Sequence, residues 1–204
     1  MRKINKVIIC ALFLFVSLTV PYIGFSSEQT AERPNYSSGD HWIFINHKGK
    51  LKKIDFLREE DNTYIFSKMK NIYSQEGTDI IRDFELTKVG NKHHKGYPGP
   101  IIKFPLKIGN MWDYKYEKTE GKIYNRLAEY TVESYEQLTV TAGKFWAFKI
   151  KSYDKPMGAP LLYVRAKPAK TKTRYYWYSP DVKQIIKDQK QSGKYTELKE
   201  YNIK

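Results

Sequence analysis

Histidines are the first residues in this sequence that could bind a metal or move a proton. The chain has four of them, His41, His47, His93 and His94. The adjacent pair stands between Lys92 and Lys95, whose positive charges oppose a bound cation. We therefore expect no metal site, and we interpret the pair as part of a solvated loop.

Serine, lysine and carboxylate residues lack the context that catalysis requires. Ser67 and Lys70 have the S-x-x-K spacing of some serine acyl enzymes, which relies on a helical turn, but this segment has the pattern of a strand. Asp83 and Glu85 fit the solvent side of a strand better than an acid–base pair. The sequence contains no phosphate-binding loop, dinucleotide glycine pattern or nucleophile elbow. We expect a non-enzymatic protein without catalytic residues or a cofactor, with a hydrolase as the least favoured alternative.

Aromatic residues are the main remaining sign of a binding site. The chain has four tryptophans and 17 tyrosines. The runs 145–148 and 175–178 place aromatic side chains on both faces of a strand. One face would belong to the core, and the other could line a ligand site or the outer surface. The candidate ligand-binding residues are Trp42, Trp112, Trp146, Tyr176, Trp177 and Tyr178.

A basic segment, residues 165–174 (RAKPAKTKTR), contains no acidic residue and no large apolar side chain. We expect it to form the tip of a hairpin in solvent. The candidates for contact with an anionic surface are Arg165, Lys167, Lys170, Lys172 and Arg174. Anionic lipid, an acidic polysaccharide or an envelope protein would be suitable partners, whereas a solvated loop that prevents aggregation is the alternative. No specific nucleic-acid signature accompanies these charges.

The elements that carry these residues are predicted to be strands. Apolar residues alternate with polar ones through 80–86, 112–117 and 124–133, which indicates half-buried antiparallel strands. Turn residues separate the alternating runs, as at 47–50, 119–121 and 192–193. We predict an all-β fold, an antiparallel meander that forms a twisted sheet, an open barrel or a sandwich.

A short motif divides the chain into two similar parts. Gly39-Asp40-His41-Trp42 returns as Gly109-Asn110-Met111-Trp112, and each copy should form a tight turn that begins a strand with a largely buried tryptophan. We predict one β domain over 37–204, with halves at about 37–88 and 105–204 joined by a connector at 89–104. Residues 28–36 should form a flexible leader. Two independent domains are the alternative.

The second half also resembles a known group of sequences. It contains P-L-x-x-G-x-x-W-x-Y from Pro105, V-x-A-G-x-F-x-A-F-K-I from Val140 and Y-W-Y-S-P from Tyr176. These motifs, in this order, resemble a family of uncharacterised exported bacterial proteins, with Thr141 in place of its usual proline. The resemblance implies a secreted β domain, with a curved sheet or open barrel similar to envelope lipid carriers. It supplies no catalytic residues.

The N-terminal segment predicts export. Arg2, Lys3 and Lys6 precede the apolar run Val7–Val20, and small residues follow at Ser26 and Ser27. This is the pattern of a signal peptide over 1–27, and the run is short for a membrane span. Cys10, the single cysteine, lies inside it, so the rest of the chain has no thiol or disulfide. An uncleaved N-terminal membrane anchor is the alternative.

Together these features predict an extracytoplasmic protein, periplasmic or secreted. Removing three basic residues with the signal peptide lowers the formal net charge from +14 to +11, which favours anionic partners without specifying one. The favoured function is a non-catalytic envelope binding module for an amphiphilic or anionic ligand. A structural or protein-interaction module without an internal ligand site is the alternative.

The signal peptide makes a direct prediction. Intact-mass measurement of the exported protein should place its first residue between Ser26 and Gln29. Recovery of a chain that begins at Met1 from the membrane fraction would establish the anchor instead.

Overall fold

Antiparallel strands form most of the structure, as the alternation predicts. The computed structural model describes residues 29–60, 63–67, 69–73, 79–83, 101–119, 123–157 and 170–204. Within those ranges the one helical element is a 3-10 turn, η1 (Pro180–Val182). The strands are β1 (Thr30–Ala31), β2 (His41–Asn46), β3 (Leu51–Glu60), β4 (Thr63–Phe66), β5 (Met69–Tyr73), β6 (Asp79–Asp83), β7 (Ile102–Lys103), β8 (Leu106–Lys107), β9 (Met111–Thr119), β10 (Ile123–Val140), β11 (Gly143–Pro156), β12 (Lys172–Ser179), β13 (Gln184–Lys190) and β14 (Tyr195–Asn202). The predicted signal peptide and the pair His93-His94 lie outside the described residues.

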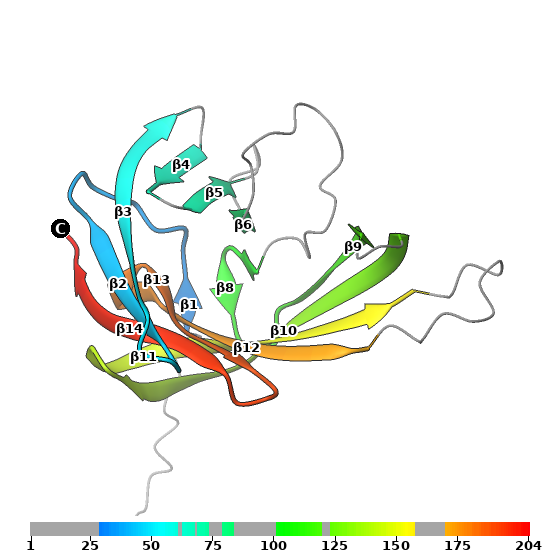
Figure 1. Cartoon of the computed structure of the whole chain (residues 1–204). Coiled ribbons are helices and arrows are strands. Elements are labelled where there is room, and N and C mark those ends of the chain that lie inside the picture. Colours follow the sequence, from blue (N-terminus) through cyan, green and yellow to red (C-terminus); the bar gives the residue numbers. More distant parts are fainter. Residues whose placement is uncertain are drawn as a thin grey trace, which may run out of the picture.

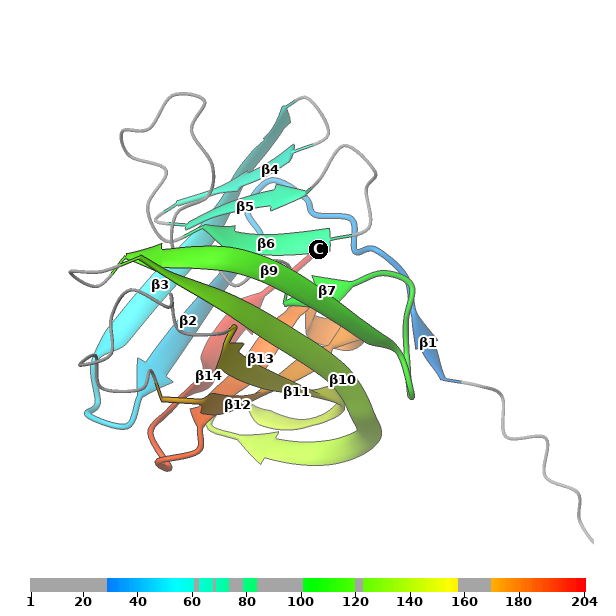
Figure 2. The same cartoon turned by 90° about the vertical axis from the view of Figure 1, so that its right-hand side faces the viewer.

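Twelve strands form one antiparallel sheet, in the spatial order β7-β6-β5-β4-β3-β2-β14-β13-β12-β11-β10-β9. The first half of the chain contributes the meander β2–β7 and the second half the meander β9–β14, and they meet where β2 pairs with β14. Within the described ranges the edge strands β7 and β9 do not pair with each other, so the curved sheet stays open (Figure 1 and Figure 2). The predicted all-β fold, two half-repeats around one core, is confirmed.

Two long strands bend the sheet. β3 pairs with β2 through its first half and with β4 through its second, with a register shift between Phe56 and Arg58. β10 pairs with β9 only as far as Thr131, and a register shift between Val132 and Ser134 follows at once. Because a bulge bends a strand and increases its twist, each shift turns the sheet where its neighbour ends.

The repeated motif forms the same turn in both halves. Gly39 and Gly109 have φ of +97° and +86°, a conformation that favours glycine. The N–H groups of the next residues, Asp40 and Asn110, donate back to carbonyls three positions earlier. The motif therefore begins β2 and β9 in equivalent ways. The two tryptophans differ, however: Trp42 is fully buried, whereas Trp112 is only partly buried.

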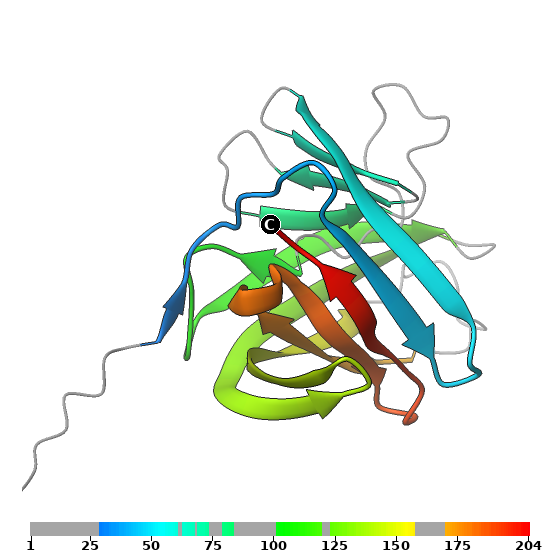
Figure 3. The same cartoon turned by 90° about the vertical axis from the view of Figure 1, so that its left-hand side faces the viewer.

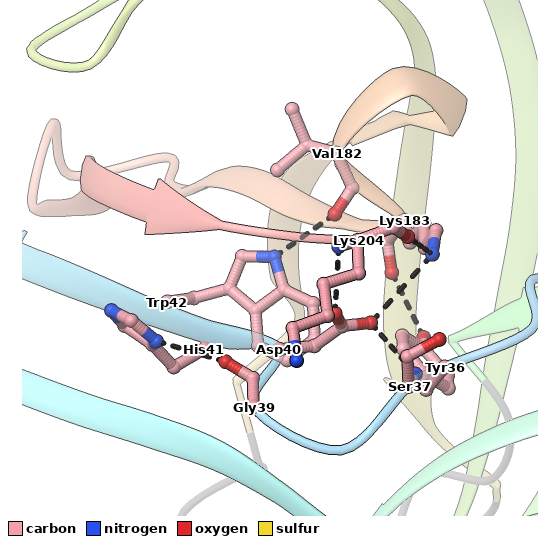
Figure 4. Close-up of polar contacts among 9 residues, drawn as sticks. All are labelled: Tyr36, Ser37, Gly39, Asp40, His41, Trp42, Val182, Lys183 and Lys204. Carbon is pink, nitrogen blue, oxygen red and sulfur yellow. Dashed lines mark hydrogen bonds and ion pairs between the residues drawn. The ribbon is translucent and has the colours of Figure 1, made fainter.

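A buried carboxylate joins the first turn to the far end of the chain (Figure 4). Asp40 has no exposed surface, and its two oxygens accept hydrogen bonds from the backbone N–H of Ser37 and of Lys204, both at 2.9 Å. The Lys183 ammonium lies 3.6 Å from the same carboxylate. Beside it, Trp42 Nε1 donates to the Val182 carbonyl at 2.9 Å. These bonds hold the start of β2 against η1 and against the segment after β14.

The β10–β11 hairpin folds back onto the sheet. Beyond its register shift β10 pairs, among the described strands, only with β11. Figure 3 shows the yellow-green end of this hairpin curling beneath the orange and red strands. At its tip, Ala142 N donates to the Leu198 carbonyl, and Thr141 Oγ1 donates to Glu197 at 2.7 Å. Phe145 packs edge-on against Tyr201. The tip therefore covers part of β14.

Two segments expected to be irregular contain ordered structure. Thr30 and Ala31, in the predicted flexible leader, form β1 and pair with β8, and Ala31 is buried. Tyr36 packs against Trp42, Phe56, Tyr64 and Phe66. In the predicted connector, Ile102 lies in β7 and is fully buried. The polar composition of the predicted leader and connector did not indicate that a few apolar residues in each hold these segments against the core.

The difference between the two tryptophans is testable by unfolding. Trp42→Ala should lower the free energy of unfolding by about 3–5 kcal/mol, the range for emptying a buried aromatic site. Trp112→Ala should cost clearly less, because its side chain keeps contact with solvent. Urea denaturation of both variants measures this, and equal costs would contradict the placement of Trp112.

Candidate ligand groove on the outer face

The second half of the sheet has two chemically distinct faces. On β10, Ala128, Tyr130 and Val132 are buried, and they define the core face. Leu127, Glu129 and Thr131 point the other way and keep partial exposure, and they define the outer face. The sequence predicted this alternation. The outer face is accessible to solvent where the back-folded β10–β11 hairpin does not cover it.

A groove of about 660 Å³ crosses the outer face of β9, β10 and β11. Its residues are cross-strand neighbours: Thr131 lies opposite both Met111 and Lys151, and Glu129 lies opposite both Asp113 and Tyr153. Leu127 extends the row on β10. Trp112 and Tyr130 also border the groove, although their rings belong to the core face, where they stack with centroids 5.3 Å apart. The register of three strands thus assembles the site.

The groove combines apolar surface with charges of both signs. Met111 is 76% exposed and Tyr153 38% exposed, so both side chains present apolar surface to solvent. The Lys155 ammonium pairs with Glu129 at 2.8 Å and lies 6.0 Å from the Tyr153 ring centroid. Lys151 lies 3.6 Å from Glu133. Such a surface suits a ligand with an apolar part and a polar head, and the local charges do not select a simple anion.

The predicted aromatic site residues do not form one cluster. Trp42 and Tyr178 are enclosed in the core, with exposures of 0% and 1%. Tyr176 is also buried on the core face, beneath the Arg174 guanidinium. Of the six candidates, Trp112 alone borders the groove.

The remaining two candidates belong to the back-folded hairpin region. Trp177 is covered by this hairpin and donates from Nε1 to Glu136 at 2.9 Å. This bond, with one from Ser134, lowers the pKa of Glu136. Trp146 is 48% exposed and stacks on Tyr135. Sequence reasoning missed Met111, Leu127, Lys151 and Tyr153. Met111 is only the variable position of the repeated turn motif and the other three belong to no motif, so only strand alternation could have placed them on the outer face.

Part of the predicted basic surface is engaged within the protein. Arg165 and Lys167 lie outside the described residues, and Lys170 and Lys172 are exposed. Arg174 lies on β12 and forms a bidentate ion pair with Asp188 of β13. Although residues 165–174 contain no acidic residue, strand pairing places the Asp188 carboxylate beside Arg174 and neutralises that charge.

A second ion pair lies on the core face, at the same end of the sheet as Arg174. Arg126 is 3% exposed, and its Nε donates to Asp154 Oδ1 at 2.8 Å, while Nη2 donates to the Lys170 carbonyl at 3.0 Å. The Tyr116 hydroxyl donates to the other Asp154 oxygen at 2.9 Å. Burial, with the Asp154 charge beside it, raises the pKa of Tyr116 well above its usual value. These groups satisfy one another, so we assign them a structural role.

The described residues contain no group of three or more His, Cys, Asp or Glu side chains that could hold a metal ion. In the same ranges, no helix is long and apolar enough to cross a membrane.

Similarity to known proteins is found by structure and not by sequence. No protein-family model matches it, and no curated protein matches its sequence. Solved structures with similarity include a candidate lipoprotein from Parabacteroides distasonis (13% identity, TM-score 0.44, covering 86% of this chain and 100% of that one). They also include a candidate exported protein with a YmcC-like fold from Bacteroides fragilis (14%, 0.39, 84% and 99%) and the hypothetical lipoprotein YmcC from Escherichia coli (8%, 0.41, 84% and 90%).

The raised pKa of Tyr116 predicts how stability depends on pH. Because the folded state favours the protonated phenol, its contribution is complete below the unfolded pKa of about 10 and is lost as pH rises beyond it. Tyr116→Phe should cost about 1 kcal/mol at pH 7, through loss of the bond to Asp154. This difference should shrink between pH 9 and pH 11. A constant difference across denaturation curves in that range would contradict the assignment.

Proposed function

We propose that this protein is an exported, non-enzymatic envelope protein that binds an amphiphilic ligand in the outer-face groove. The observation that carries the proposal is a row of apolar side chains beside Lys151 in one groove: exposed Met111 and Tyr153 and partly exposed Leu127. Its volume of about 660 Å³ lies within the usual range for small-molecule sites. The export pattern of residues 1–27 supports an extracytoplasmic location.

Each part of the groove has a role in this proposal. The apolar tail of the ligand lies along Met111 and Leu127, where it removes exposed apolar surface from water. Its polar head lies near Lys151 and Asp113, which offer one charge of each sign. Tyr153 can pack on the boundary between the two parts, as tyrosines do where an apolar surface meets a wet one. A head that carries both charges suits this arrangement better than a purely anionic one.

The proposal is tested by titrating monomeric lysophosphatidylcholine, which has a zwitterionic head, and lysophosphatidylglycerol, which has an anionic one. We expect binding of both by calorimetry, with higher affinity for the zwitterionic lipid. Leu127→Asp should weaken binding about tenfold or more, because it places a charge against the tail. Tyr153→Ala should weaken it about fivefold.

Trp146→Ala is the matched control, since it removes an exposed aromatic residue outside the groove. It should leave the affinity unchanged, and circular dichroism should show that all three variants are folded. Absence of binding to either lipid, or equal binding by the wild type and Leu127→Asp, would overturn the proposal.

A further inference from the structure

Strand β9 forms an open edge of the sheet. Among the described residues, its nine residues pair only with β10, in an unbroken register from Met111–Thr131 to Thr119–Ile123. Its sequence, MWDYKYEKT, contains no proline. A long, regular edge presents backbone donors and acceptors to another strand, and natural proteins normally block such edges. The opposite edge strand, β7, has two residues and is too short to fill it.

The internal repeat shows how an equivalent edge is filled. β2 begins with the same turn as β9, and on the side away from β3 it pairs antiparallel with β14. In that pairing Trp42 lies opposite the aromatic Tyr201. Trp112 holds the matching position on β9, yet it is less buried than Trp42. An antiparallel neighbour for β9 would make the two halves alike.

The side chains of β9 are complementary to β9 itself. If two copies pair antiparallel with Tyr114 opposite Tyr114, Asp113 of each copy lies opposite Lys115 of the other. Both residues are exposed on the outer face. On the core face, Trp112 then lies opposite an aromatic residue, Tyr116, as Trp42 does in the β2–β14 pair. Opposite charges and aromatic pairs across strands each stabilise a sheet.

The neighbouring registers that keep the faces matched are unfavourable. A shift that centres the pairing on Asp113 sets two carboxylates opposite each other, and one that centres it on Lys115 sets two ammonium groups opposite each other. Like charges in direct opposition destabilise a strand pair. The charges on this edge therefore act selectively: they oppose these two self-pairings and favour the one centred on Tyr114.

We propose that β9 is a dimerisation edge, on which a second copy of this chain adds its own β9 antiparallel and centred on Tyr114. The resulting two-fold symmetry is the commonest one for homodimers. Since Met111 and Asp113 also border the groove, the two grooves would lie on either side of the symmetry axis. The inference rests on the β9 edge and not on the proposed ligand, because the experiments that test the residues of this edge need no ligand. A short strand pairing suggests association at about micromolar concentrations.

Charge exchange is the first test. Sedimentation equilibrium should show a monomer–dimer equilibrium for the wild type. Asp113→Lys and Lys115→Asp should each weaken dimerisation about tenfold or more, because each replaces two attractive pairs with two repulsive ones. The double variant should restore it. Glu200→Lys and Lys194→Asp, exposed residues in and before β14, are matched controls with the same changes in charge.

Disulfide trapping is the second test, and it reports the register. Directly opposed residues in an antiparallel pair have Cα atoms about 4.5–5.5 Å apart, which suits a disulfide. Without residues 1–27 the chain has no cysteine, so Tyr114→Cys should yield a covalent dimer on mild oxidation. Tyr195→Cys, exposed on β14, should remain monomeric under the same conditions.

Several results would overturn the proposal. They are a wild type that stays monomeric at about 100 µM, a dimer that survives both single charge reversals, and a double variant that does not recover. Failure of Tyr114→Cys to cross-link more than Tyr195→Cys would also overturn it. None of these outcomes depends on lipid binding, so failure of the groove proposal leaves this inference in place, and the reverse is also true.

Discussion

The fold depends on how the two meanders are joined by the pairing of β2 with β14, and the buried Asp40 carboxylate lies at that junction. It lies at the start of β2 and accepts the backbone N–H groups of Ser37 and Lys204, which come from opposite ends of the described chain. A buried carboxylate is costly unless it is hydrogen-bonded and paired, and here the Lys183 ammonium supplies the opposite charge. Removing one of these partners would leave the buried carboxylate without a hydrogen bond or without its opposite charge. The β2–β14 pairing is therefore tied to the conformation of the segments around it.

Given that junction, the bends in β3 and β10 decide what the sheet encloses and what it exposes. The register shift after Val132 sends the end of β10 and the start of β11 back over β14, where Glu136 covers Trp177. Before the shift, β10 stays in register with β9 and β11, and its outer face remains open as the groove. One irregularity thus separates a covered half of the outer face from an exposed half.

The groove and the β9 edge lie next to each other, and both exist because the sheet is open. In the first half of the chain, β14 fills the position beside β2, and Trp42 is buried in full. In the second half the described residues leave that position beside β9 open, and Trp112 keeps part of its surface in contact with solvent, next to exposed Met111. A binding module and a dimerising module are compatible here, because one uses the outer face and the other uses the backbone of the edge.

The sequence by itself determined the all-β class, the strand faces of the second half and the equivalence of the two G-[DN]-x-W turns, because alternation and positive-φ glycines are local properties. It could not assign the aromatic residues: Trp42, Trp112, Trp146 and Trp177 share a residue type, yet one is in the core, one borders the groove, one is exposed and one is covered by a hairpin. The Arg174–Asp188 and Asp40–Lys183 pairs were equally hidden, since their partners are distant in sequence. Tertiary structure alone decided these, because strand order, register shifts and the back-folded hairpin determine which faces meet, and none of them is encoded in a short stretch of residues.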